Sequence, residues 1–172
     1  MFEGVVLGVD PGTAAVGLVV VDGRGTKPRL EWAETLRTPS GMAAAQRLHR
    51  LHRAVRDAIA RYQPEVLAIE RLMWGRNTGS AMEVARASGV VLLAAAEAGV
   101  RVEEYAPLEV KMAVTGVGNA PKETVRRSLE RLIGLVDVPA DPDAADAAAV
   151  AVCHLQQSRL RSLTRAQAGA HR

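Results

Sequence analysis

The apolar positions along the chain predict strands first and helices later. Two runs rich in β-branched residues, 4–10 and 15–22, lie on either side of a Pro-Gly turn, and a run with alternating polar residues follows at 29–37. Short connections between such runs are typical of hairpins. We therefore expect a meander of three antiparallel strands.

The pattern changes after Ser40, where apolar residues recur at helical spacing until Pro64. Ser40 is the expected N-cap of this amphipathic helix. The remaining predicted elements, in chain order, are a buried strand at 65–70, a helix at about 79–98, a strand at 101–105 and helices at 107–114, 121–134 and 141–157, the last with Asp141 as its expected N-cap. Helices that alternate with strands after an antiparallel meander predict an α/β fold, in which a mixed sheet carries helices on both faces.

Composition and charge set the domain organisation. With 172 residues, of which 48% are hydrophobic, the chain is long enough for one domain with a sizeable core. The net charge of +3 reflects the last 15 residues, which hold four arginines and no acid and leave 18 basic against 19 acidic residues elsewhere. We expect a domain at 1–157 and a basic, flexible tail at 158–172, which either adds weak phosphate contacts or is simply solvated.

The chain begins MFEGVVLGVD, without a basic n-region or a cleavage site, and no run of 18 apolar residues is free of charge. These features indicate a cytosolic protein. The single cysteine, Cys153, lies in an Ala/Val-rich segment and is expected to be a buried thiol without a catalytic role. His49, His52 and His154 are expected to be structural.

Asp10 ends the first predicted strand, on the same face as Val6 and Gly8. Ligand sites in open α/β sheets form at this carboxyl edge, where a buried carboxylate requires a partner or a cation. Taken alone, Asp10 is equally well explained as the acceptor of an Asx-turn at the Pro-Gly dipeptide.

Three further acids change this balance. Glu70 repeats the arrangement, because EVLAIE also ends an apolar strand in an acid, whereas Glu65 precedes the strand and is expected to face solvent. Asp143 and Asp146 are three apart and so share one face of the last helix. Asp143 would also complement the helix dipole without any further role, but structure alone does not explain Asp146 among Ala and Val residues. If the two strands are neighbours, Asp10 and Glu70 repel each other unless a divalent cation lies between them.

The four acids predict the class of metal. Carboxylates without a nearby pattern of His or Cys ligands favour Mg²⁺ or Mn²⁺ over Zn²⁺. Two such ions, about 4 Å apart, activate a water and stabilise the attacking and leaving oxygens of an in-line displacement at phosphorus. The sequence thus predicts a two-metal site that acts on phosphate esters.

Four ordered segments, GVDPGT, AIERLMWGRNTGSA, YAPLEVKMAVTGVGNAPKETV and DPDAADAAAVAVCH, resemble the RuvC family of crossover (Holliday) junction endodeoxyribonucleases in order and spacing. The resemblance covers about residues 4–157. It implies a ribonuclease H-like fold, a homodimer, and two-metal hydrolysis that nicks two strands of like polarity symmetrically at a four-way junction, in DNA recombination and repair. It implies that the catalytic and metal-binding acids are Asp10, Glu70, Asp143 and Asp146. Association with a branch-migration complex of RuvA and RuvB is a further expectation of the resemblance alone.

The resemblance also places residues near the DNA. The family's loop after the second acid carries a large stacking side chain, typically Phe; here Met73 stands at this position, and we expect the adjacent Trp74 to take over part of the role because Met stacks poorly. The full set of expected DNA contacts is Arg71, Met73, Trp74, Arg76, Asn77, Lys111 and Lys122. The helix at 79–98 is the expected dimer interface, through its small residues Ala81, Ala85, Ser88 and Gly89, although core packing explains these equally well.

Three other functions share parts of the pattern. An ATPase or sugar kinase of the actin-like class opens with a similar Asp-x-Gly-Thr hairpin, but it needs a duplicated domain and a second Gly-rich phosphate loop that this sequence lacks. A non-catalytic junction-binding protein is disfavoured because all four acids are present. A nuclease of the same fold that acts on RNA stays open, although the segments around Lys111 and Lys122 favour junction DNA. The preferred cleavage sequence and the choice between Mg²⁺ and Mn²⁺ are also open.

Overall fold

The fold is a mixed five-stranded sheet between two layers of helices. The computed structural model describes residues 4–39, 41–72, 78–133 and 138–169. Within these residues the strand order is β3-β2-β1-β4-β5. The strands are β1 (Val5–Pro11), β2 (Ala15–Asp22), β3 (Arg29–Arg37), β4 (Val66–Glu70) and β5 (Arg101–Tyr105). The first three strands pair antiparallel, β4 pairs parallel to β1, and β5 pairs parallel to β4, which confirms the predicted mixed sheet.

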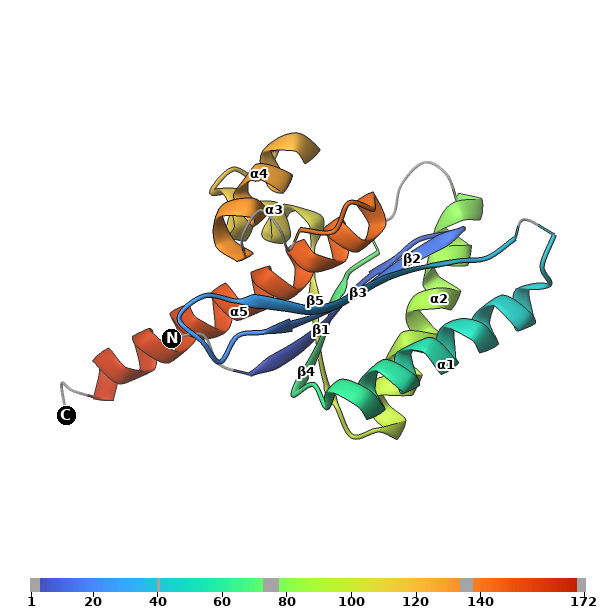
Figure 1. Cartoon of the computed structure of the whole chain (residues 1–172), viewed down its shortest axis with the longest axis horizontal. Helices are drawn as coiled ribbons and strands as arrows, with labels where there is room; N and C mark the ends of the chain where they lie inside the picture. The colour runs from blue at the N-terminus through green and yellow to red at the C-terminus, as the bar shows by residue number, and fades with distance from the viewer. Residues whose placement is uncertain (1–3, 40, 73–77, 134–137, 170–172) are drawn as a thin grey trace.

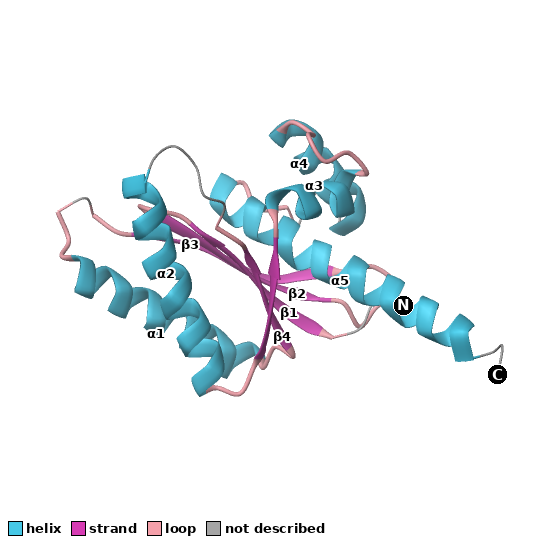
Figure 2. Ribbon diagram, turned by 180° about the vertical axis from the view of Figure 1, so that it is seen from behind, coloured by secondary structure: helices cyan, strands magenta, loops and turns pink. Residues whose placement is uncertain are grey.

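The helices are divided between the two faces of the sheet. Figures 1 and 2 show α1 and α2 on one side and α3, α4 and α5 on the other. Their bounds are α1 (Ala44–Tyr62), α2 (Thr78–Glu97), α3 (Pro107–Thr115), α4 (Lys122–Ile133) and α5 (Pro142–Gly169). The sheet is therefore covered on both faces, as the alternation of predicted helices and strands requires.

Alternation along the buried strands divides the core in two. Leu7 and Val9 of β1 pack with α1 and α2, whereas Val6 packs with α5. Side chains of successive strand residues point to opposite faces, so Asp10 lies on the same face as Val6. The last acid of β1 is thus directed to the side of the sheet that α5 covers.

Two glycines allow α5 to lie unusually close to the sheet. A Cβ atom at Gly17 of β2 would overlap the carbonyl oxygen of Asp143, and one at Gly8 of β1 would overlap that of Ala147. The contact face of the helix carries alanines, such as Ala147 and Ala151, which are fully buried. Backbone thus meets backbone where the beginning of α5 crosses β1 and β2, and larger side chains on either surface would push them apart.

Two predicted helix ends were wrong. α1 begins at Ala44, after Ala43 in the N-cap position without a side-chain cap, rather than after Ser40. Before the helix, the amide of Met42 donates to the carbonyl of Pro39 at 3.0 Å, which closes a turn. At the other end, α5 continues through the expected flexible tail to Gly169, because no Pro or Gly occurs between Gln157 and this residue.

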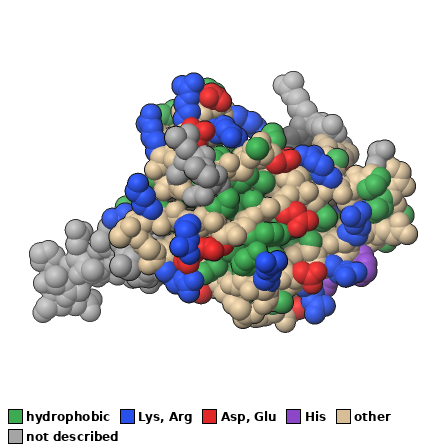
Figure 3. Space-filling view, in the orientation of Figure 1, with side chains coloured by type: hydrophobic (Ala, Val, Ile, Leu, Met, Phe, Trp, Pro, Cys, Tyr) green, Lys and Arg blue, Asp and Glu red, His purple; other side chains and the backbone are tan. Residues whose placement is uncertain are grey.

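The surface carries charges of both signs. Figure 3 shows basic and acidic side chains interspersed on one face, as expected for a nearly neutral domain.

The helix α2 has an unusually apolar composition. In the part of the chain that the structure describes, one stretch, Gly79–Glu97 of α2, is long and apolar enough to span a membrane by length and composition. Packing within the molecule buries 28% of this stretch, including Val91, and Glu83 pairs with Arg47 of α1 at 3.2 Å.

Candidate active site

A single row of paired residues across the sheet positions the predicted acids. Asp10 of β1 lies opposite Gly17 of β2, and Gly17 lies opposite Thr35 of β3. On the other side of β1, the parallel register that pairs Val9 with Ile69 places Asp10 beside Glu70, the last residue of β4. Directly opposed residues of neighbouring strands share a face. Asp10 and Glu70 therefore lie side by side, on the face covered by α5.

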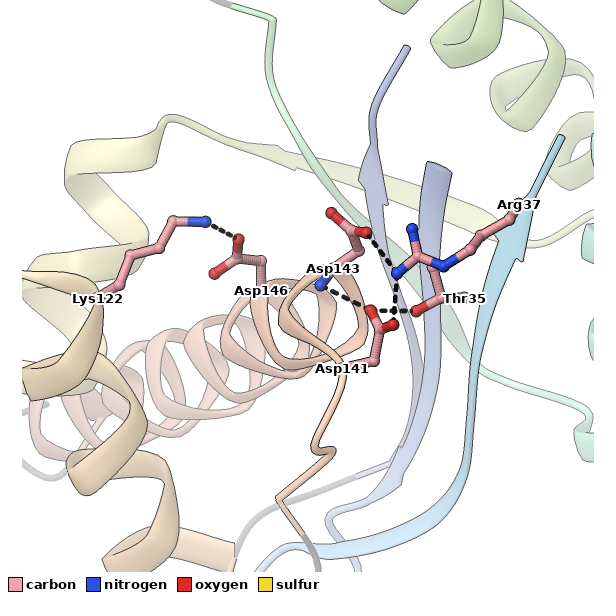
Figure 4. A network of polar contacts seen from close by, with 6 residues as sticks. All are labelled: Thr35, Arg37, Lys122, Asp141, Asp143 and Asp146. Carbon is pink, nitrogen blue, oxygen red and sulfur yellow. Dashed lines mark hydrogen bonds and ion pairs between the residues drawn. The ribbon is translucent and has the colours of Figure 1, made fainter. Parts of the chain in front are cut away.

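The first two turns of α5 bring the other two acids to the same row. Asp143 lies in the first turn, and its backbone passes directly over Gly17. Asp146 follows three residues later on the same side of the helix, and Figure 4 shows both carboxylates projecting from the start of α5. The close approach of helix and sheet thus brings together acids from β1, β4 and α5 that are up to 136 positions apart in the sequence.

Two basic side chains face the acids from opposite sides. The ammonium group of Lys122, at the beginning of α4, donates to Oδ2 of Asp146 at 2.7 Å. On the far side, a guanidinium nitrogen of Arg37 in β3 lies 3.5 Å from Oδ2 of Asp143 and 2.5 Å from Oδ2 of Asp141 (Figure 4). The cluster is thus flanked by positive charge, but it holds more carboxylates than cations.

The electrostatics of the row follow from burial and crowding. Burial first, and then the neighbouring carboxylates of Glu70, Asp146 and Asp143, together raise the pKa of Asp10 to about 7, against the effect of Lys122. The pKa of Glu70 is also raised, first by burial and then by Asp146. Carboxyl groups whose pKa values are raised by burial and by neighbouring acids are typical of functional sites.

The donor set fits a hard divalent cation. All four side chains are carboxylates, the ligands that Mg²⁺ and Mn²⁺ prefer, and a dication would offset the repulsion that raises the pKa of Asp10. Among the described residues, no three Asp, Glu, His or Cys side chains converge on one metal position. Two of the acids instead pair with Lys122 and Arg37. Each of these pairs engages one carboxylate oxygen, Oδ2, so Oδ1 of Asp143 and of Asp146 can take part in ligation while the pairs persist.

The predicted DNA contacts fall into two groups. Lys111 of α3 and Lys122 of α4 lie on the side of the cluster nearest Glu70, whose pKa both lower against the effect of burial. The backbone of Arg71 is fixed by a bond from its amide to the carbonyl of Tyr105 at 2.8 Å, and its exposed side chain lies 3.5 Å from Glu109. The other four expected contacts, Met73, Trp74, Arg76 and Asn77, lie outside the described residues.

His52, His154 and Cys153 agree with their predicted structural roles. His154 is buried, and its Nδ1 lies 2.7 Å from the hydroxyl of Tyr105. His52 pairs with Glu97 at 2.9 Å, which joins α1 to α2. Cys153 is buried, and burial raises the pKa of its thiol to about 12, so it is a poor nucleophile.

Sequence reasoning missed three residues at the border of the cluster. Thr35 and Arg37 of β3 both bind Asp141, which sequence analysis identified only as the N-cap of α5. The cap itself is confirmed, because Oδ1 of Asp141 accepts from the amide of Asp143 at 3.0 Å. No sequence signal links a strand end to a residue more than 100 positions later, since this contact depends on strand register and helix docking.

Comparison with known proteins identifies close relatives. A family model described as "Crossover junction endodeoxyribonuclease RuvC" matches residues 6–154. A protein of that description from Moorella thermoacetica is 45% identical over 164 residues, which are 95% of this chain and 98% of the relative. One from Rubrobacter xylanophilus is 42% identical over 93% of this chain and 89% of the relative.

Solved structures show the same similarity. The structure described as Thermus thermophilus RuvC in complex with Holliday junction substrate has a TM-score of 0.87 and 38% identity, and covers 92% of this chain and 96% of that one. The yeast mitochondrial Holliday junction resolvase Ydc2, at 12% identity and a TM-score of 0.68, covers 91% of this chain and 80% of that one, and shares the fold alone. These matches confirm the ribonuclease H-like fold.

We predict that Asp10→Asn stabilises the metal-free protein, and more so as the pH rises. The unfolded chain ionises Asp10 near its ordinary pKa of 3.8, whereas the folded protein holds the proton until about pH 7, so the wild type loses stability between these values. The gain from Asp10→Asn should therefore be small at pH 4.5 and reach its full size above pH 7. Urea unfolding in EDTA at both pH values measures the gain in stability. Glu65→Gln, at an exposed position just before β4, is the control. A gain of equal size at both pH values would contradict the electrostatic assignment.

Proposed function

The chain belongs to the RuvC family of crossover junction endodeoxyribonucleases, and on this basis we propose that it resolves Holliday junctions as a homodimer by metal-dependent hydrolysis at four carboxylates. A nuclease acting on DNA is what the family relationship gives directly. The proposal adds the residues, the metal and the assembly. It also includes the symmetric pair of nicks expected from the sequence resemblance and a cytoplasmic location.

One observation carries the proposal. Acids that end two neighbouring parallel strands, Asp10 and Glu70, lie on the same face as the first two turns of α5, which carry Asp143 and Asp146. The raised pKa of Asp10 reflects all three other acids, so the four act electrostatically as one cluster. An arrangement of this kind is costly without a function, because each carboxylate makes the ionisation of the others harder.

The four acids are proposed to hold two Mg²⁺ or Mn²⁺ ions. When bound, such ions supply an activated water and stabilise the charge that develops at phosphorus. Asp10 and Glu70, fixed on adjacent strands, give the site its rigid side, and Asp143 and Asp146 close it from the helix. Because the pKa of Asp10 is about 7, its proton must leave before it can serve as an anionic ligand near neutral pH.

Lysines and arginines around the cluster are proposed to hold the DNA backbone. Lys122 is well exposed, follows a Gly-rich loop and already pairs with Asp146, so it can reach a phosphate that enters beside this acid. Lys111 and Arg71 lie on the same side. For Met73, Trp74, Arg76 and Asn77, the proposed contact with the junction rests on the sequence resemblance.

The exposed face of α2 supports the homodimer. Met82 and Leu93 are 52% and 54% exposed, and Ala85 and Gly89 lie between them on the same side of the helix. A Cβ atom at Gly89 would meet no atom of this chain within 4 Å, so core packing does not require the glycine. An apolar stripe with small residues fits a second copy of the same helix across a two-fold axis, and a two-fold dimer would present two sites to the two equivalent strands of a junction.

Glu70→Gln tests the role of the acids. The substitution keeps the shape of the side chain but removes a negative charge from the cluster, so cleavage of a synthetic mobile four-way junction in Mg²⁺ or Mn²⁺ should fall roughly 100-fold or more while junction binding is retained. Glu65→Gln, at the exposed start of the segment that leads into β4, is the matched control and should cleave normally. Equal rates on linear duplex or on an RNA hybrid would contradict junction specificity, and wild-type rates in Glu70→Gln would contradict the site.

Leu93→Glu tests the dimer. A carboxylate at this end of the apolar stripe would be buried in the interface without a partner, so the variant should sediment as a monomer where the wild type sediments as a dimer. Leu108→Glu on α3, where the leucine is 63% exposed on the opposite side of the sheet, is the control and should stay dimeric. A dimeric Leu93→Glu variant, or a monomeric wild type, would contradict the proposed interface.

A further inference from the structure

The end of β3 is fastened to the beginning of α5 by three polar side chains. Thr35 donates from its hydroxyl to Oδ1 of Asp141 at 2.6 Å, and Arg37 donates to Oδ2 of the same carboxylate at 2.5 Å (Figure 4). β3 is the last strand on its side of the described sheet. These bonds therefore connect the edge of the sheet directly to the helix that carries two of the four acids.

Asp141 also binds the first turn of the helix. Its Oδ1 also accepts from the amide of Asp143, and its carbonyl accepts from the amide of Ala145 at 2.9 Å. The same carboxylate thus binds β3 on one side and caps α5 on the other. Any rotation of the first helical turn relative to the sheet would have to break these bonds.

Arg37 reaches beyond Asp141 to the acid cluster. The guanidinium nitrogen that binds Asp141 lies 3.5 Å from Oδ2 of Asp143, so one side chain spans both carboxylates. A guanidinium is planar and holds its donors in a fixed fork, which restricts where each carboxylate can lie. Arg37 is more than half exposed, with 60% of its side chain accessible, and neither core packing nor the proposed metal site requires an arginine there.

We propose that Arg37 is a positioning residue: through Asp141 and by direct contact it holds the first turn of α5, whose backbone lies over Gly17, so that the carboxylate of Asp143 joins the other three acids. The inference rests on the proposed function, since it concerns the same site. It assigns a role to the end of β3, a strand that contributes no acid to the cluster. It also explains why the N-cap of α5 is an aspartate with an additional partner, when a serine or asparagine would cap equally well.

Electrostatics makes the proposal separable from a simple charge effect. If Arg37 acted only as a positive charge near the site, its removal would strengthen the binding of a divalent cation, because like charges repel. If it positions Asp143, its removal weakens cation binding despite the lost repulsion. The direction of the change in affinity thus distinguishes the two roles.

The test is Mn²⁺ binding without DNA, measured by electron paramagnetic resonance on Arg37→Gln. We expect affinity to fall about 10-fold or more, the range found for groups that orient metal ligands, while the affinity for the junction is unchanged and the single-turnover rate at saturating junction falls. Arg37→Lys should recover only part of the affinity, because an ammonium keeps the charge without the fork. Arg29→Gln, which removes an arginine of the same strand paired only with Glu31 in the described contacts, should bind Mn²⁺ like the wild type.

A second variant keeps the inference testable if Arg37→Gln does not fold. Thr35→Val removes one bond to Asp141 without changing any charge, and it should weaken Mn²⁺ binding in the same direction by a smaller factor. Unchanged or tighter Mn²⁺ binding in Arg37→Gln would overturn the inference, as would weaker junction binding with a normal rate at saturation, which is the result for a phosphate contact. A wild type that fails to cut junctions would overturn the proposed function instead, since the Mn²⁺ measurement uses no DNA.

Discussion

The contact of α5 with β1 and β2 is the constraint on which the site depends. At Gly17 and Gly8 the helix backbone lies against the strand backbone, and a single methyl group at either position would overlap a helix carbonyl. Helices that pack on sheets through ordinary side chains lie farther away. The absence of side chains at these two positions, together with alanines on the helix, is what brings the carboxylates of α5 within electrostatic reach of Asp10.

This closeness has a cost that the surrounding residues offset in part. Carboxylates gathered at a partly buried edge resist ionisation, as the raised pKa values of Asp10 and Glu70 indicate. Lys122 and Arg37 neutralise some of this charge from two sides, while Asp141 holds the helix in place despite the repulsion. Repulsion between carboxylates is retained where it has a use, and a bound dication would offset it by attracting each of the four carboxylates.

Sequence reasoning reached the four acids because each carries a local signal: Asp10 and Glu70 end apolar strands, Asp146 stands in a helix of Ala and Val, and Asp143 lies three residues before it on the same helix face. Strand and helix positions followed from the same periodicities. Contacts that depend on docking, such as Arg37 with Asp141, have no local signal, because they require both the register of β3 and the path of α5. The missed helix ends have local causes as well, a turn before Ala44 and an uninterrupted helical sequence after Gln157.

The most direct test of this account is the affinity of Gly17→Ala for Mn²⁺, because glycine has no side chain that could ligate a metal or contact DNA. The added methyl group should lift the first turn of α5 from the sheet, so the account predicts a folded protein, by circular dichroism, with a lower melting temperature and clearly weaker Mn²⁺ binding. Gly41→Ala, at a position where a Cβ meets no atom within 4 Å, should match the wild type. Wild-type Mn²⁺ affinity and stability in Gly17→Ala would show that the close approach of helix and sheet is not what assembles the site.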